Sequence, residues 1–200
     1  MEHDDRVTLT VANADFVTDR LAVGGDLDLY DAELVVAQVL ELKAAGITHV
    51  LDVRREWDDA VIWADVPGVA YRWDGIDDAG QRVPASWFEG VATWALEALR
   101  DPDAKLLTHC HMGINRGPSA GYAVLLALGW DPFEALDAIR RARPIAHVAY
   151  AEDALRWHHE RTGADPATRD RDRRRMQLWR EENNLDLLGV IRRIRRHVAW

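Results

Sequence analysis

The sequence predicts an α/β fold: a three-layer domain in which helices flank a central, mainly parallel sheet, followed by a C-terminal amphipathic helix. Strand-like and helix-like segments alternate along most of the chain, as they do in α/β domains. A nearly continuous apolar run at 47–53 directly follows a helical pattern, which is typical of a parallel strand buried on both faces. A second run, 118–128, is apolar on most helical faces and predicts a helix buried at the centre of the domain.

Length and composition place the chain among ordinary globular proteins of one domain. Its 200 residues are enough to bury a core without staples, and 48% are hydrophobic and 30% charged. The single cysteine excludes an internal disulfide framework and fits a reducing compartment. Residues 1–6 are acidic and lack a signal-peptide pattern, and no run of about 18 apolar residues predicts a transmembrane segment. We therefore expect a cytoplasmic protein.

The net charge of −9 is unevenly distributed. Residues 167–200 contain ten Arg against five Asp or Glu, a net charge of +5, which leaves −14 for residues 1–166. An acidic body argues against general nucleic-acid binding by the main domain, whereas the basic tail leaves that question open. We expect two parts, a domain over residues 1–163 and a basic helical extension over residues 164–200.

The first part of the chain predicts two short strands, a helix and a buried strand. The segments 7–11 and 20–23 have strand character, and a glycine pair interrupts the second. A helix is expected over 31–45, because an aspartate can cap it, apolar residues recur at helical spacing and Gly46 ends it. The buried strand at 47–53 follows.

The middle of the chain leads to another strand by way of a polar loop. Residues 56–70 have loop-like or weakly helical character, and 69–73 predicts a strand. The polar segment 74–82 is typical of a surface loop. An amphipathic helix is expected over 84–100, with proline as its first residue, and a strand over 105–109.

The last part of the body predicts three helices. The buried helix at 118–128 is followed by one over 132–143, which begins with an aspartate cap and a proline. A further helix is expected over 149–161, and 163–168 has the composition of a linker.

The tail predicts an amphipathic basic helix with one apolar face. Its apolar face consists of Leu187, Ile191, Ile194 and Val198, and its basic residues are Arg192, Arg193, Arg195 and Arg196. We expect the apolar face to pack on its own domain or on a second subunit, that is, self-association. The alternative is contact with an anionic surface, a membrane or a nucleic acid.

The one cysteine stands in a sequence context that favours chemistry over simple packing. An apolar strand pattern ends at Cys110, five residues including a glycine follow, and Arg116 precedes the start of the buried helix. A loop that leads into a helix N-terminus collects backbone N–H groups and the positive end of the helix dipole, which suits an anion. The same field favours the thiolate form of the cysteine. A lone cysteine is more often a small buried residue, but the surrounding pattern favours a nucleophile here.

The segment 109–116, His-Cys-His-Met-Gly-Ile-Asn-Arg, resembles the signature loop of the cysteine-based protein tyrosine phosphatases, particularly the compact dual-specificity branch. The segments 20–25, 45–53 and 141–144 also resemble corresponding parts of that family. The resemblance covers about residues 17–160 and implies a phosphotyrosine phosphatase-like fold.

The resemblance also implies roles for individual residues. Cys110 would be the nucleophile that forms a phosphocysteine, and Arg116 would offer a planar fork to two phosphate oxygens. The general acid should be an aspartate on a separate loop, and family spacing matches Asp78 best, Asp77 second and Asp74 third. The expected phosphate cradle consists of His111, Met112, Gly113, Ile114, Asn115 and Arg116.

Two features of the loop depart from the common family pattern. Gly117 stands where members usually have Ser or Thr, whose hydroxyl stabilises the thiolate as it leaves, and we expect Ser119 to point elsewhere. We therefore expect slow hydrolysis of the phosphocysteine. The loop interior also resembles that of RNA 5′-triphosphatases of the same fold and has no lysine, which makes a highly charged lipid headgroup a poorer expectation.

We expect no metal and no cofactor. Neighbouring residues at a strand end point to opposite sides, so His109, Cys110 and His111 cannot easily share an ion, and no carboxylate is spaced nearby in the sequence. His109 is expected to support the loop through hydrogen bonds. His158 and His159 are expected to be half-exposed on the last helix of the body.

The predicted function is that of a phosphatase acting on phosphate monoesters, chiefly phosphotyrosine with phosphoserine and phosphothreonine as further substrates. Its partner would be a phosphorylated protein or peptide. Two alternatives stay open: an RNA 5′-triphosphatase or phosphatase of the same fold, and a catalytically weak phosphate-binding module.

Overall fold

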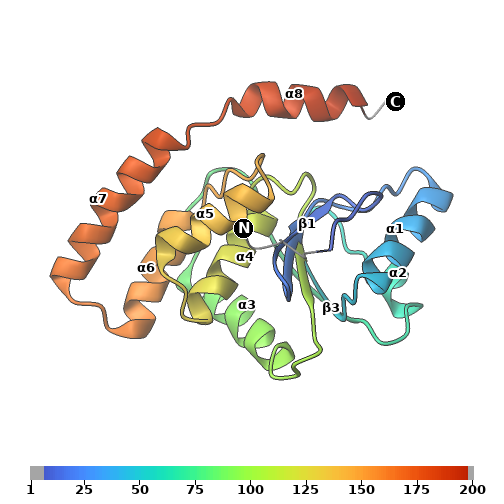
Figure 1. Cartoon of the computed structure of the whole chain (residues 1–200), viewed down its shortest axis with the longest axis horizontal. Helices are drawn as coiled ribbons and strands as arrows, with labels where there is room; N and C mark the ends of the chain where they lie inside the picture. The colour runs from blue at the N-terminus through green and yellow to red at the C-terminus, as the bar shows by residue number, and fades with distance from the viewer. Residues whose placement is uncertain (1–6, 198–200) are drawn as a thin grey trace, which may run out of the picture.

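The computed structural model describes residues 7–197, the last three of them by their backbone alone, and shows the predicted three-layer α/β domain (Figure 1). In the described residues, five strands form one sheet in the order β1-β2-β5-β3-β4. Only the pair β1 and β2 is antiparallel. In sheet order the strands are β1 (Ala14–Thr18), β2 (Leu21–Gly24), β5 (Leu106–His109), β3 (His49–Arg54) and β4 (Ala70–Ile76).

The strand expected at 7–11 is wrong, because the first strand begins at Ala14. A side-chain carboxylate takes the place of a neighbouring strand in this segment. Glu41 accepts the backbone N–H groups of Thr10, Val11 and Ala12 at 2.6–2.9 Å. These N–H groups are therefore unavailable for a sheet ladder, and pairing starts only beyond them.

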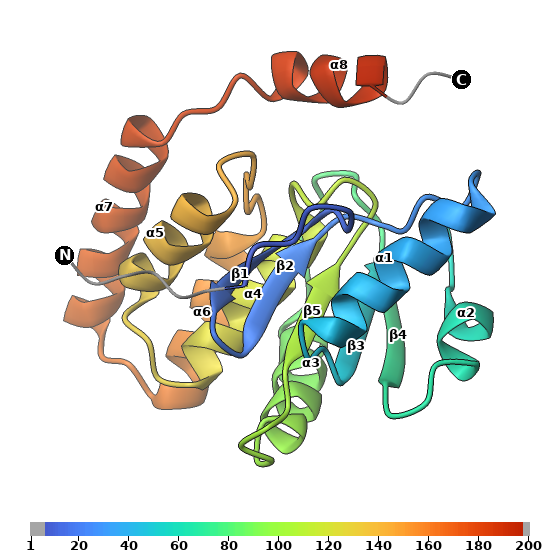
Figure 2. The same ribbon diagram turned by 45° about the vertical axis from the view of Figure 1, so that its right-hand side comes forward.

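Helices cover both faces of the sheet (Figures 1 and 2). One face carries α1 (Ala32–Ala44), which the predicted Asp31 caps, and the short α2 (Ala60–Ala64). The other face carries α3 (Ala85–Ala98), α4 (Arg116–Ala127), α5 (Pro132–Ala142) and α6 (Ala151–Thr162). Two apolar clusters, one on each side of the sheet, make up the core.

The central helix α4 begins at Arg116, two residues before the expected start at Pro118. A proline at the third helical position costs little, because the first four N–H groups of a helix have no intrahelical partner. Eleven residues of α4 are buried, which agrees with its apolar pattern. The earlier start makes Arg116 part of the helix and fixes the direction from which its side chain leaves the backbone.

The expected linker at 163–168 is also wrong in its second half. Asp165 accepts the backbone N–H of Thr168 and caps α7 (Pro166–Glu182), so only three residues separate α6 from α7. Met176 and Trp179 of α7 are buried in the larger core cluster. The boundary between residues 163 and 164 stays a prediction.

His159 is buried rather than half-exposed, because it faces the tail. Its Nε2 lies 2.9 Å from the Oδ2 of Asp172, which is itself buried on α7. His158 is half-buried, as expected. The histidine–aspartate pair thus links the end of the body to the helix that follows it.

The last described helix, α8 (Leu187–His197), lies across one end of the domain, beyond the carboxyl ends of the parallel strands (Figure 2). Val190 of this helix is buried. Val198 and the side chains of Arg195 and Arg196, which belong to the predicted amphipathic pattern, lie outside the described part. Within residues 7–197, no helix combines the length and apolar character that crossing a bilayer requires.

Candidate active site

The single cysteine lies at the bottom of the loop between β5 and α4. The Cys110 backbone N–H donates to the carbonyl of Gly24 at 3.1 Å, which extends the pairing of β5 with β2 by one residue. Cys110 is 2% exposed. The loop then turns into α4, so it brings the thiol close to the positive end of a helix dipole. This is the strand, loop and helix start that the sequence predicts.

Arg143 anchors the loop between β5 and α4 through hydrogen bonds to two of its carbonyl groups. Its Nε donates to the Gly113 carbonyl at 2.6 Å and its Nη2 to the Met112 carbonyl at 3.0 Å. The guanidinium is anchored in turn by Asp15 at 2.6 Å and Asn13 at 2.7 Å. Arg143 is buried, and its bond to the Gly113 carbonyl is shielded from water. The resemblance of the 141–144 segment to the phosphatase family did not by itself indicate this role for Arg143.

Gly113 is the residue that lets the loop pass so close to Arg143. Its φ of 65° lies in the left-handed region. A Cβ at this position would meet Arg143 Nη2 at 2.5 Å and the backbone of Gly24 at 2.5 Å. Only glycine fits both the backbone angle and the space.

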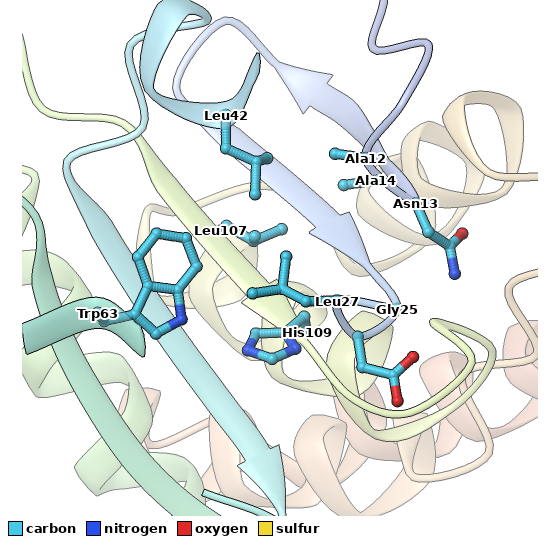
Figure 3. A pocket seen from close by; sticks show the side chains of 10 residues that line it. Ala12, Asn13, Ala14, Gly25, Leu27, Leu42, Trp63, Leu107 and His109 are labelled. Atoms are coloured by element: carbon cyan, nitrogen blue, oxygen red, sulfur yellow. The ribbon is translucent and has the colours of Figure 1, made fainter. Parts of the chain in front are cut away.

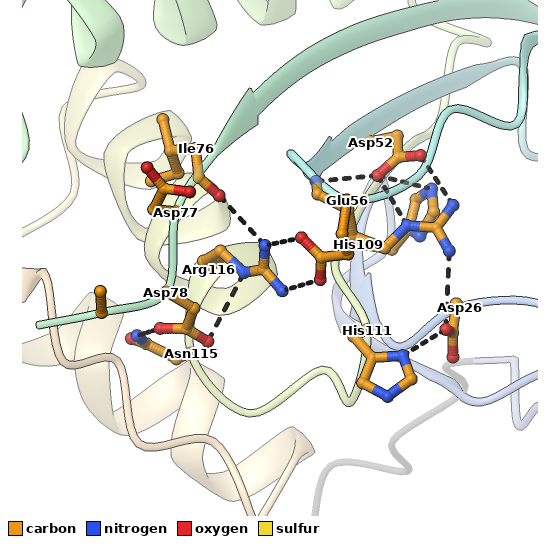
Figure 4. Close-up of polar contacts among 12 residues, drawn as sticks. Asp26, Asp52, Glu56, Ile76, Asp77, Asp78, His109, His111, Asn115 and Arg116 are labelled. Carbon is orange, nitrogen blue, oxygen red and sulfur yellow. Dashed lines mark hydrogen bonds and ion pairs between the residues drawn. The ribbon is translucent and has the colours of Figure 1, made fainter.

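Arg116 is fixed by three of its five N–H groups (Figure 4). Glu56 accepts from Nη1 at 2.6 Å and from Nη2 at 2.5 Å, and the Ile76 carbonyl accepts from Nη1 at 3.0 Å. Nε is buried without a hydrogen-bond partner among the described residues. The remaining donors, Nε–H and the second Nη2–H, form one edge of the guanidinium, which is the edge that can bind two oxygens of a phosphate group.

Glu56 is a functional candidate that sequence reasoning missed. It lies two residues beyond the end of β3, Cys110 directly follows β5, and β3 and β5 are parallel neighbours. The carboxyl ends of parallel strands meet at one edge of a sheet, which is where α/β proteins bind ligands. That rule is a signal that could have indicated Glu56. The hydrogen bond from Arg116 lowers the Glu56 pKa to about 2, so the carboxylate is ionised at neutral pH.

Asp78 reaches over the loop and approaches Arg116. Its Oδ2 lies 3.5 Å from Arg116 Nε, and its Oδ1 accepts from the Asn115 side-chain amide at 2.6 Å. The hydroxyl of Tyr150 lies 3.3 Å from the same Oδ1. The structure thus brings Asp78 beside the predicted cradle.

The two competing aspartates make other contacts. Asp77 pairs with Arg55 at 2.7 Å and more than half of its side chain is exposed. Asp74 pairs with Arg72 at 2.6 Å. Figure 4 shows Asp77 beside Ile76 and turned away from Arg116. Of the three aspartates, Asp78 is the one that the fold brings to the cysteine loop.

A pocket of about 420 Å³ opens above Cys110. Asp78 and Gly80 form one side of it, and His147 and Ala149 lie on the segment between α5 and α6. Five of the six predicted cradle residues line the pocket: His111, Met112, Ile114, Asn115 and Arg116. Gly113 turns toward Arg143 instead. Leu187 and Ile191 of α8 complete the lining.

Besides Arg116, His111 can place a positive charge at the loop when its imidazole is protonated. Its Nδ1 donates to Asp26 Oδ2 at 2.6 Å, and this hydrogen bond raises the His111 pKa. About half of the His111 side chain is exposed. The raised pKa increases the share of the protonated imidazolium beside the place expected for an anion.

His109 does not support the loop through hydrogen bonds, contrary to the expectation. Both of its ring nitrogens are buried without a hydrogen-bond partner among the described residues, and Nε2 lies 4.0 Å from Asp52 Oδ1. The ring points to the α1 side of the sheet, where it borders a small cavity with Leu27 and Trp63 (Figure 3). Burial lowers the His109 pKa, so the ring is neutral and packs as a core residue.

Two carboxylates do lie near His109, although the sequence places none nearby. Asp52, Asp59 and His109 have ligand atoms within 4.8 Å of one another. Arg54 lies among them, with Nη2 2.7 Å from Asp52 and 2.5 Å from Asp59. A cation is therefore already present between the carboxylates, and this set does not call for a metal.

The structure gives a reason for Gly117. A Cβ at this position would lie 3.0 Å from the Cys110 nitrogen and from two backbone atoms of His109. A Ser or Thr would press on the strand end that carries the cysteine. Ser119 is buried, and its Oγ lies 3.4 Å from Asn115 Oδ1.

The fold is that of the dual-specificity phosphatases, which solved structures of several such proteins share. Human DUSP28 is similar with a TM-score of 0.61 and 19% identity, over 75% of this chain and 95% of that one. Tk-PTP in its active form matches with a TM-score of 0.57 and 24% identity, over 74% and 97% of the two chains. PTPMT1 in complex with PI(5)P matches with a TM-score of 0.63 and 16% identity, over 76% and 97%.

These likenesses establish the fold and nothing more, because the sequences are less than 25% identical. No protein-family model matches the sequence, and no curated protein matches it either. What the site does must therefore be argued from its own residues.

Proposed function

We propose that this protein is a cysteine-dependent phosphatase that hydrolyses phosphate monoesters through a phosphocysteine intermediate. The observation that carries the proposal is that Cys110, at the bottom of the pocket, and Arg116 line the same pocket, and that the Nε edge of Arg116 makes no hydrogen bond to the described residues and faces Asp78 alone, at 3.5 Å. A buried guanidinium with two open donors next to a nucleophile suits a phosphate dianion. The folds of DUSP28 and Tk-PTP support the same reading.

In the first step the Cys110 thiolate attacks phosphorus. A sulfur–phosphorus bond forms, and the ester oxygen leaves with the bonding electron pair. Asp78, in its protonated form, gives its proton to that oxygen, so the product is a neutral alcohol or phenol. Arg116 and the loop N–H groups hold the three remaining oxygens as negative charge develops on them.

In the second step water attacks the phosphocysteine. The ionised Asp78 takes a proton from the water, the sulfur–phosphorus bond breaks, and inorganic phosphate and the thiolate are released. Gly117 offers no hydroxyl to the departing thiolate, so this step is the slower one. Neither step requires a metal or another cofactor.

The substrate is a phosphorylated protein or peptide, with phosphotyrosine preferred and phosphoserine or phosphothreonine also accepted. The pocket is open enough to admit a side chain, and Arg116 and His111 supply positive charge at one end of it. A thiol nucleophile must stay reduced, which supports a cytoplasmic location for the activity.

The test compares an aryl phosphate, a phosphotyrosine peptide and a 5′-triphosphorylated RNA, each with a chelator present. Wild type should hydrolyse the first two, and Cys110→Ser should abolish the activity. The aspartates provide a matched pair: Asp78→Asn should reduce turnover strongly, whereas Asp77→Asn should not. Equal rates for wild type and Cys110→Ser on every substrate would refute the proposal. Activity confined to RNA would point to a 5′-phosphatase instead, and binding without turnover to a phosphate-binding module.

A further inference from the structure

We propose that Leu187 and Ile191 of α8 are specificity-determining residues that form an apolar wall for the ring of an aryl phosphate. This inference rests on the proposed phosphatase function and deepens it. It predicts a preference for phosphotyrosine over phosphothreonine that is built into the C-terminal extension rather than into the cysteine loop.

The position of α8 is set by the helix that leads into it. Arg180, near the end of α7, donates to the carbonyls of His147 and Val148 at 2.9 Å and of Ala149 at 3.2 Å. Arg140 donates to the Asn183 carbonyl just beyond α7. These contacts tie the end of α7, four residues before α8 begins, to α5 and to the segment 147–149 beside the pocket. Figures 1 and 2 show α8 across the end of the domain in both views.

The pocket is lined by both polar and apolar side chains. Its positive groups, Arg116 and His111, belong to the cysteine loop. Leu187 and Ile191 are aliphatic, and they line the pocket together with Met112 and Ile114 of the loop. When the phosphate of a substrate is bound at Arg116, the part of the substrate next to the phosphate can contact these apolar side chains.

The space between α8 and the cysteine loop suits the aromatic ring of phosphotyrosine better than the short side chain of phosphothreonine. A pocket of about 420 Å³ exceeds what a phosphate group needs. The ring of phosphotyrosine fills the apolar part and keeps the peptide backbone at the rim. Phosphothreonine has only a short link between phosphate and backbone, so the polar backbone would have to enter the apolar region and lose hydrogen bonds with water.

The position of α8 beside the pocket could also mean that the helix blocks the site, but the contacts argue against this. A segment that blocks the cradle would have to supply acceptors for the Nε edge of Arg116, which makes no hydrogen bond to the described residues. Leu187 and Ile191 carry no acceptor that could do so, and the pocket remains open between α8 and Cys110. The helix therefore acts as a wall of the site.

The experiment measures kcat/KM for two peptides of the same sequence, one with phosphotyrosine and one with phosphothreonine. The test variant is Leu187→Ala/Ile191→Ala. The matched control is Leu188→Ala, because Leu188 is next to Leu187 on the same helix but 66% exposed. Inhibition by orthovanadate, which mimics the transition state at the cradle, checks that the loop is intact.

We expect the double variant to lower the ratio of phosphotyrosine to phosphothreonine activity about tenfold, since it removes apolar contact with the ring only. The control should leave the ratio unchanged, and vanadate inhibition should be the same in all three proteins. If the double variant loses vanadate inhibition, the single variants Leu187→Ala and Ile191→Ala replace it, each with an expected decrease of about threefold.

Two outcomes would overturn the inference while the proposed function stands. An unchanged ratio in the variants means that α8 does not contact the ring. Equal increases on both peptides mean that α8 obstructs the site. A wild type with no phosphatase activity, by contrast, would refute the proposed function itself.

Discussion

Glu56 binds the guanidinium of Arg116 with both carboxylate oxygens, at 2.5 and 2.6 Å, across 60 residues of sequence. The carboxylate occupies the terminal edge of the guanidinium and leaves the Nε edge without a hydrogen bond, with Asp78 Oδ2 3.5 Å from Nε. Glu56 thus acts as a positioning residue: it orients the fork toward the space above Cys110.

Removing this carboxylate should reduce catalysis through Arg116. We expect Glu56→Ala to lower kcat/KM about 10- to 100-fold on an aryl phosphate, because the guanidinium loses its fixed orientation. Vanadate inhibition should weaken in parallel. Glu97→Ala, at an exposed position of α3, is the control and should behave as wild type. Unaltered kinetics in Glu56→Ala would show that Ile76 and the helix alone hold Arg116.

The same pair predicts a pH dependence of stability. The hydrogen bond from Arg116 lowers the Glu56 pKa from its ordinary value of 4.5 to about 2. A depressed pKa in the folded state stabilises the fold above the unfolded value, and this contribution is lost as the pH falls. Denaturation midpoints of wild type and Glu56→Gln should therefore differ most above pH 4.5 and converge toward pH 2. Because Glu56 is partly exposed, the difference should also shrink in high salt.

Arg143 should contribute to both stability and activity, because it is buried and holds two carbonyls of the cysteine loop. We expect Arg143→Ala to lower the free energy of unfolding by about 2 to 3 kcal/mol and to reduce kcat/KM at least tenfold. Urea denaturation and steady-state kinetics measure the two effects. Arg141→Ala, at an exposed position of α5 two residues before Arg143, is the matched control. Full activity in a destabilised Arg143→Ala would limit Arg143 to a structural role.

The glycine at 117 should make breakdown of the phosphocysteine rate-limiting. Rapid mixing with an aryl phosphate should give a burst of phenol of about one equivalent per Cys110, followed by slow turnover. Acid quenching should trap phosphorylated enzyme during the slow phase. A single-phase time course without trapped intermediate would contradict this expectation.

Replacing that glycine should not simply restore a fast second step. A Cβ at 117 would lie 3.0 Å from backbone atoms of both His109 and Cys110. We expect Gly117→Ser to lower the free energy of unfolding by about 1 kcal/mol or more, because the strand end must shift. Thermal denaturation measures the change, and burst kinetics show whether the added hydroxyl acts. A variant as stable as wild type that also turns over faster would contradict the steric explanation.

The sequence predicted the fold well where the signal is local. The helix at 31–45, the strand ending at His109 and the helix at 132–143 follow from caps, stops and apolar spacing, which depend on residues a few positions apart. The errors have tertiary causes. The strand expected at 7–11 fails because Glu41 binds its backbone, and the linker expected at 163–168 ends early because Asp165 caps α7.

The candidate site divides in the same way. The roles proposed for Cys110 and Arg116 follow from the sequence alone, because the strand, the short loop and the helix start that carry them are continuous in the chain. The orienting carboxylate of Glu56, the support from Arg143 and the contact of Asp78 with Asn115 were decided by tertiary structure. These contacts join residues 30 to 60 positions apart, and no periodic pattern records which charges meet where strand ends, loops and helices converge. The wall that α8 forms over Cys110 has the same origin, since the sequence determined an amphipathic helix and only the docking of α7 decided what its apolar face covers.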